Sequence, residues 1–209
     1  MDSITDTGVE IKDNFAQLLI LEATQDEELV ALEHHDKRWG FFIGKHVLTT
    51  KEFPFDLDTT SAALVTLKNS KEHINTMLDD MLDFMNSEGL IMTYFDKSRP
   101  RIDPVVCVNV LRAFHKFGRG KDLRRTQEWI RQVLYHRAYL DGTRYYSTSE
   151  AFLYCLGRLL ETLDESEVNL YRDLKSLIVE RIRERTGVAG DLLCLAMRIL
   201  TEPLEISCI

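Results

Sequence analysis

The chain has 209 residues, of which 44% are hydrophobic and 29% charged, and its net charge is −8. This composition is typical of a soluble globular protein with a sizeable core and excludes a disordered or fibrous chain. No segment approaches the roughly 20 apolar residues that span a bilayer, and the acidic start lacks the features of a signal peptide. We therefore expect a cytoplasmic protein without a transmembrane segment.

The negative charge is concentrated near the N-terminus. Residues 1–36 contain ten acidic side chains and Lys12 as the only basic one, so the remainder of the chain is close to neutral. A basic segment at residues 97–125 carries no nucleic-acid-binding motif, which argues against a nucleic-acid partner. Its cations also suit a small anion such as a diphosphate. The four cysteines lack CxxC spacing, which indicates reduced packing residues rather than disulfides or zinc ligands.

Hydrophobic periodicity predicts an all-α protein. Residues 1–12 are interpreted as an acidic lead, and residues 13–209 as one helical-repeat domain. Asp103 followed by Pro104 is typical of a helix start, with a capping residue and then proline at the first helical position. The spacing of apolar residues predicts helices over 13–33, with a break near 24–25, and over 59–68, 71–86, 104–117, 121–137, 150–163, 165–186 and 190–200.

The helices alternate in character. Compact apolar helices begin near residues 58, 103, 147 and 190, about 40 to 46 residues apart, and each of the first three is followed by a longer charged helix. This pattern predicts about four helical hairpins, with apolar helices in an inner layer and charged helices in an outer layer. Such hairpins either continue as an open solenoid or close into an α/α toroid, and the period alone does not choose between these.

The segment FPFDLDTTSAALVTL at residues 53–67 is the strongest candidate for a reactive site. Asp56, Asp58, Thr59 and Thr60 stand directly before an apolar helix, where aspartate and threonine usually serve as N-caps. A second carboxylate one residue away is less usual. Two carboxylates in one apolar setting cannot both ionise cheaply, so one of them would keep its proton.

Two known families contain a motif of this kind. The DxDxT motif of haloacid-dehalogenase-like phosphatases must end a buried parallel strand, whereas here Pro54 precedes the motif and no βαβ alternation follows. The motif is more similar to the DxDTT acid motif of class II terpene cyclases. The closest resemblance is to the C-terminal region of fungal drimane-type, haloacid-dehalogenase-like sesquiterpene cyclases. Three stretches within residues 53–161 carry it: FPFDLDTTSAAL, RPRIDPVVCVNVLRAF and RAYLDGTRYYSTSEAFLYCLGRLL.

The resemblance implies an enzyme that cyclises farnesyl diphosphate, a linear isoprenoid diphosphate, by protonating its terminal alkene and leaving the diphosphate ester intact. Asp58 would be the proton donor, while Asp56, Thr59 and Thr60 would orient it. Magnesium would accompany the diphosphate, and no protein ligands for it are identified. The remaining implied residues bind substrate, as cations for the diphosphate or aromatic faces for the carbocation: Arg99, Arg101, Arg144, Tyr145, Tyr146 and Phe152.

Two departures from this family leave alternatives open. The 209 residues include no phosphatase domain, so we expect them not to release the alcohol. About four hairpins are fewer than a closed terpene-cyclase toroid has, which leaves open an incomplete ring or one completed by a homo-oligomer or a partner domain. The competing hypothesis is a noncatalytic helical-repeat binding or scaffold protein, or a diverged paralogue that retains the fold.

Overall fold

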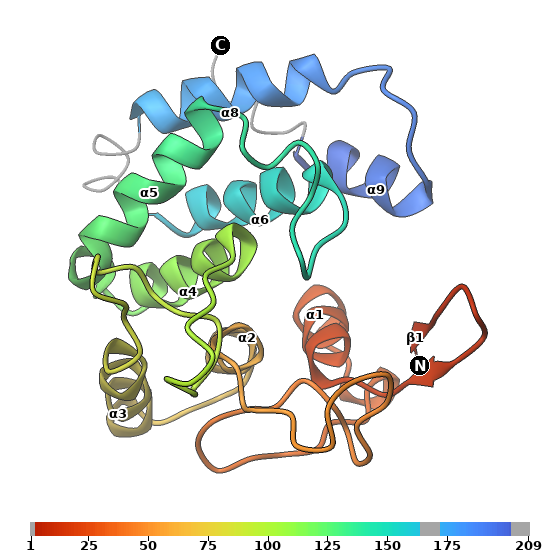
Figure 1. Ribbon diagram of the computed structural model, residues 1–209, viewed down its shortest axis with the longest axis vertical. Helices are drawn as coiled ribbons and strands as arrows, with labels where there is room; N and C mark the ends of the chain where they lie inside the picture. The colour runs from red at the N-terminus through yellow and green to blue at the C-terminus, as the bar shows by residue number, and fades with distance from the viewer. Residues whose placement is uncertain (1–2, 164–171, 202–209) are drawn as a thin grey trace. The chain divides into compact units, whose positions relative to one another are not determined.

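The computed structural model describes residues 3–163 and 172–201, and it confirms the all-α fold class (Figure 1). In the described residues no helix is both long and apolar enough to cross a membrane. The α-helices are α1 (Asn14–Thr24), α2 (Leu57–Thr66), α3 (Lys71–Leu82), α4 (Pro104–Lys116), α5 (Arg124–Tyr135), α6 (Ser149–Thr162), α8 (Arg172–Glu184) and α9 (Leu192–Thr201). Two 3₁₀ helices are η1 (Glu27–Leu29) and η2 (Gly120–Leu123).

The chain forms two compact units, and the first comprises residues 1–86 and 91–101. It begins with a small antiparallel hairpin of β1 (Ser3–Ile4) and β2 (Glu10–Ile11), in which Ser3 pairs with Ile11. Helix α1 then packs against α2. A core cluster of Leu18, Trp39, Ala62 and Ala63 lies where these elements meet.

The second unit comprises residues 87–90 and 102–209. Helices α4 and α6 lie side by side, and α5 packs on α4 while α8 and α9 pack on α6 (Figure 1). Nearly every apolar residue of α4 and α6 is buried, including Phe114 and Phe152. By contrast, α5 and α8 bury one apolar side and expose a charged one. Helices α4 and α6 thus have the buried, apolar character, and α5 and α8 the amphipathic, charged character, that the sequence predicted for these four helices.

Several predicted boundaries are confirmed and others are corrected. Helix α4 starts at Pro104 with Asp103 as its cap, and it ends before Gly118, which takes up a left-handed conformation at φ 73°. The predicted break near residue 24 is real, but the chain beyond the break forms only the short η1. The acidic lead is not entirely loose, because it contains the hairpin. The predicted helix over 165–186 is seen as α8 in its latter part, and residues 164–171 lie outside the described chain.

Helix α9 differs from the prediction of a fourth buried inner helix. Among its side chains, only Cys194 and Thr201 are buried. Five large apolar residues are more than half exposed, and Leu192 reaches 85%; the others are Leu193, Leu195, Ile199 and Leu200. The reason is that α6 is the main partner of α9 in the described structure. Cys107, Cys155 and Cys194 are buried, as expected of packing residues, while Cys208 lies outside the described residues.

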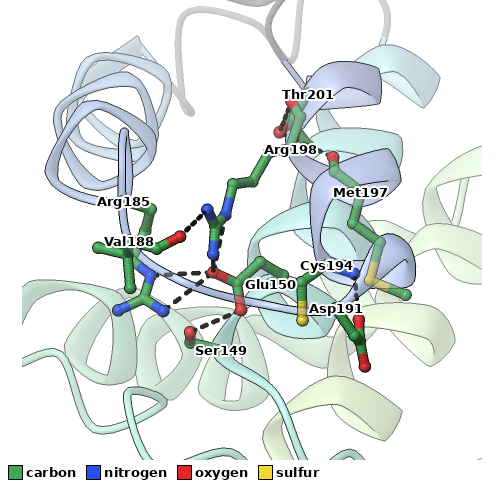
Figure 2. Close-up of polar contacts among 9 residues, drawn as sticks. All are labelled: Ser149, Glu150, Arg185, Val188, Asp191, Cys194, Met197, Arg198 and Thr201. Atoms are coloured by element: carbon green, nitrogen blue, oxygen red, sulfur yellow. Dashed lines mark hydrogen bonds and ion pairs between the residues drawn. The ribbon is translucent and has the colours of Figure 1, made fainter.

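A buried carboxylate of the second unit joins α6, α9 and the turn that follows α8 (Figure 2). Glu150, near the start of α6, is only 3% exposed. Its Oε1 accepts hydrogen bonds from Arg185 Nε at 3.0 Å and from Arg198 Nη2 at 2.8 Å, while Oε2 accepts the Ser149 hydroxyl at 3.0 Å. Burial acts to raise the pKa of Glu150, but its hydrogen bonds outweigh burial and the pKa is lowered. The carboxylate therefore stays ionised and fixes α9 to α6.

Glu150→Gln should destabilise the protein by about 3 kcal/mol, because it removes the charge that compensates two partly buried guanidinium groups. The measurement is urea unfolding followed by circular dichroism. The matched control is Asp173→Asn, which breaks the exposed Arg131–Asp173 ion pair and should cost less than about 1 kcal/mol. Equal effects of the two substitutions would contradict this role for Glu150.

Candidate active site

The aspartate motif forms the start of α2. Asp56 is the N-cap residue, with an extended backbone, and its Oδ1 accepts the Thr59 N–H at 2.6 Å. Its Oδ2 accepts the Thr59 hydroxyl at 3.0 Å, so one threonine engages both carboxylate oxygens. Asp58 lies in the first turn of the helix. The cap is therefore Asp56, and α2 starts two residues earlier than the sequence predicted.

Two other chain segments hold the motif in place. The Asp56 N–H donates to the Trp39 carbonyl at 3.2 Å, and the Thr60 hydroxyl accepts the Trp39 N–H at 2.9 Å. The same hydroxyl donates to the Asp56 carbonyl at 2.7 Å. On another side, the Leu57 N–H donates to the Thr93 carbonyl at 2.9 Å. Because these contacts join residues distant in sequence, the position of the motif is set by tertiary structure.

The two carboxylates are buried together. Asp56 is 5% exposed and Asp58 9% exposed. The pKa of Asp56 is raised from 3.8 to about 7, mainly by burial and also by the nearby charge of Asp58, while the hydrogen bonds from Thr59 oppose the increase. A carboxyl group in this state holds its proton near neutral pH. The pair can thus supply a proton from a site that excludes bulk water.

A series of aromatic rings in edge-to-face contact begins at the motif. Asp56 forms an isolated antiparallel bridge with Tyr94, whose ring contacts the Phe53 ring edge-to-face at 5.7 Å. Phe53 in turn contacts Phe42 at 5.2 Å, and Phe42 contacts Phe41 at 5.0 Å. These rings supply apolar, electron-rich surface in the same unit as the acid pair. The sequence alone does not place Phe41, Phe42 and Tyr94 at the site, because only tertiary contacts bring them there.

Two of the predicted diphosphate-binding arginines belong to the same unit as the acid pair. The Arg101 carbonyl accepts the Thr93 N–H at 2.8 Å. The Thr93 carbonyl in turn accepts the N–H of Leu57, the first residue of α2. Arg99 forms an ion pair with Asp96, with Nε 3.3 Å from Oδ2, and its side chain is 34% exposed. The backbone thus places both residues on the segment that borders the motif.

The remaining predicted substrate residues belong to the second unit. Arg144 and Tyr145 are exposed and Tyr146 is partly buried. Phe152 is fully buried and stacks on Tyr139, with ring centres 4.9 Å apart. This contact shows a packing function for Phe152. That these four residues meet the substrate stays a prediction.

Other groups at the site were not predicted. Ser61, one helical turn after Asp58, has a buried hydroxyl without a hydrogen-bond partner. The His35 ring lies edge-on to Trp39 and Phe55, at 5.6 and 5.4 Å. No group of three or more histidine, cysteine, aspartate or glutamate side chains in the described residues could hold a metal ion.

Asp56→Asn should stabilise the protein at alkaline pH. Since the folded-state pKa of about 7 lies above the unfolded-state value, this carboxyl favours folding most below pH ~4, and the contribution is lost as the pH rises to about 7. The difference between the two pKa values corresponds to about 4 kcal/mol. Asparagine retains the cap without the ionisation.

The measurement is the free energy of unfolding in urea at pH 5 and pH 8. We expect the difference between Asp56→Asn and wild type to grow by about 2–3 kcal/mol in favour of the variant over this interval. Asp26→Asn is the matched control, because Asp26 caps η1 at an exposed position. Parallel pH dependence of wild type and Asp56→Asn would show that the carboxyl is ionised throughout.

Comparison with known proteins shows the family to which the chain belongs. The family model described as "Sesquiterpene cyclase astC-like C-terminal domain" matches residues 1–117, which contain the whole motif. The chain is 50% identical over 199 residues to drimenol cyclase drtB of Aspergillus calidoustus, covering 95% of this chain and 37% of that protein. The chain thus spans little more than a third of the length of this relative. No solved structure matches. From the family match over more than half of its residues, the chain belongs to the family of astC-like sesquiterpene cyclase C-terminal domains.

Proposed function

We propose that the protein is a class II-type terpene cyclase that converts farnesyl diphosphate into a drimane-type bicyclic diphosphate by protonation. The observation that carries the proposal is the buried Asp56–Asp58 pair, in which the pKa of Asp56 is raised to about 7. Family membership and the drimenol cyclase relative support a sesquiterpene substrate. The proposal concerns cyclisation alone, in the cytoplasm, and leaves the diphosphate ester of the substrate intact.

In this proposal the acid pair supplies one proton. Both oxygens of Asp56 are engaged by Thr59, which suits an orienting partner, so Asp58 is the donor to the terminal alkene carbon. The alkene π electrons form the new C–H bond, and Asp58 is left as a carboxylate. The two carboxyl groups titrate as a coupled pair that holds one proton near neutral pH, and this shared proton is the one that Asp58 delivers to the alkene. The start of α2 adds the partial positive charge of a helix N-terminus.

The remaining steps need an apolar lining that excludes water, and a bound diphosphate. Internal alkenes attack the carbocation in turn, and loss of one proton to a base ends the cyclisation, so atoms and charge balance. Aromatic faces next to the motif, Phe53 and Tyr94, suit the cationic intermediates. Arg99 and Arg101 are proposed to bind the diphosphate. Magnesium would enter with the substrate and neutralise part of the charge of its diphosphate.

Asp58→Asn should lower the rate of cyclisation by about 10³-fold or more, because it removes the donated proton. The assay is incubation with farnesyl diphosphate and magnesium, then phosphatase treatment and product analysis by gas chromatography with mass spectrometry. The exposed cap variant Asp26→Asn should retain activity within about twofold. If wild type and Asp58→Asn give the same profile without a cyclic alcohol, the proposal fails, and a noncatalytic binding or scaffold protein becomes the better hypothesis.

Arg101→Gln should raise KM for farnesyl diphosphate by about tenfold with little change in kcat, because a charge-assisted contact to the diphosphate would be lost. Steady-state kinetics measure both constants. Arg131→Gln, which removes an exposed arginine from α5 that pairs with Asp173, serves as the control and should leave both constants unchanged. An unaltered KM in Arg101→Gln would remove this residue from the substrate-binding set.

A further inference from the structure

A second cluster in the first unit surrounds Arg38, which directly precedes Trp39. The Arg38 guanidinium donates two hydrogen bonds to Asp80 on α3, from Nε to Oδ2 at 2.7 Å and from Nη2 to Oδ1 at 2.6 Å. It also lies over two aromatic rings, 5.0 Å from the centre of Phe84 and 4.6 Å from the centre of Phe95. We call Arg38, Asp80, Phe84 and Phe95 the Arg38 clamp.

The Arg38 clamp uses properties that are particular to arginine. A planar guanidinium can bind a carboxylate through two parallel hydrogen bonds and at the same time stack on aromatic rings. The side chains of Arg38 and Asp80 are 35% and 26% exposed, so the pair is partly shielded from water. An exposed ion pair fixes little, whereas two hydrogen bonds and two ring contacts together fix the position and the plane of the guanidinium.

The backbone next to Arg38 and at Phe95, on the two sides of the clamp, is hydrogen-bonded to the backbone of the acid motif. Next to Arg38, the Trp39 carbonyl accepts the Asp56 N–H at 3.2 Å. On the other side, the Phe95 N–H donates to the Phe55 carbonyl at 3.1 Å, directly before Asp56. The clamp therefore ties together the two segments between which Asp56 lies, and it anchors them to α3.

We propose that Arg38 and Asp80 are positioning residues for the Asp56–Asp58 pair. By holding the two flanking segments together, the clamp fixes the positions of the two carboxyl groups relative to each other and keeps water away from them. This inference rests on the proposed function, because it assigns a purpose to the placement of the acid pair.

Other titratable groups border the clamp and the segments that it holds. Asp83 acts electrostatically on Arg38, and the Lys97 Nζ lies 5.6 Å from the centre of the Phe84 ring. The His34 and His35 rings each lie 5.6 Å from the Trp39 ring. Their charges remain in place when Arg38 or Asp80 is substituted, so a difference between such variants reports on the clamp itself.

The test compares Arg38→Met, Arg38→Lys, Asp80→Asn and the double variant Arg38→Met/Asp80→Asn. Arg38→Met should lower kcat by about tenfold or more with KM within about twofold, because misplaced catalytic groups affect turnover more than binding. The alkaline limb of the pH profile of kcat should move to lower pH by at least about half a unit as water reaches the carboxyl groups. The double variant should be no worse than Arg38→Met, since both substitutions remove one interaction.

Arg38→Lys keeps the charge and the fold but loses the paired hydrogen bonds. The alkaline limb of its kcat–pH profile should therefore lie between those of wild type and Arg38→Met. The matched control is Arg137→Met, because Arg137 also forms two hydrogen bonds to one carboxylate, that of Glu184. It lies in the second unit and should leave kcat and the pH profile unchanged. A merely structural clamp would lower stability alone, so an unshifted limb and wild-type kcat in both Arg38 variants overturn the proposal.

A second readout separates this inference from the proposed function. The carboxyl carbon of Asp56, assigned with Asp56→Asn, can be titrated by ¹³C NMR without any substrate. If wild type forms no cyclic product, the proposed function has failed, yet the clamp is still tested. A titration midpoint lower by at least about half a pH unit in Arg38→Lys supports positioning by the clamp, whereas an unchanged midpoint overturns it.

Discussion

Two carboxylates buried side by side at one helix start are the constraint on which the rest of the candidate site depends. Burial and the neighbouring charge of Asp58 raise the pKa of Asp56 to about 7, so the folded protein has to hold this group against an unfavourable solvation energy. The surroundings make that possible. Thr59 occupies both oxygens of Asp56, and Trp39 and Thr93 fix the backbone on either side of it.

The same arrangement accounts for the structural function of the motif and fits the chemical function proposed for it. Asp56 caps α2 in the ordinary way, and a cap alone would be well served by an exposed, ionised aspartate. The second carboxylate and the dry setting add nothing to capping, and they reduce stability. A cost of this kind is typical of a site where a group must be ready to release its proton.

Glu150, one of the buried charged residues of the second unit, follows a different principle. It is compensated by Arg185 and Arg198, so the pKa of Glu150 is lowered rather than raised. This network stabilises an ionised group and connects helices. The contrast between Glu150 and Asp56 separates a carboxylate that stays ionised and holds helices together from a carboxyl group whose pKa is raised to about 7, although both lie near the start of an apolar helix.

Local signals in the sequence are enough to predict the all-α class, most helix positions and the acid motif: helical periodicity, the Asp103–Pro104 start and the DLDTT pattern. They do not reveal which aspartate caps α2, the exposure of α9, or the contacts of Trp39, Tyr94 and Arg38. The contacts of Trp39 and Arg38 join residues 21 and 42 positions apart in the chain, and Tyr94 pairs with the distant Asp56, which no local pattern encodes. The tertiary structure sets how deeply the acid pair is buried, and burial raises the pKa of Asp56.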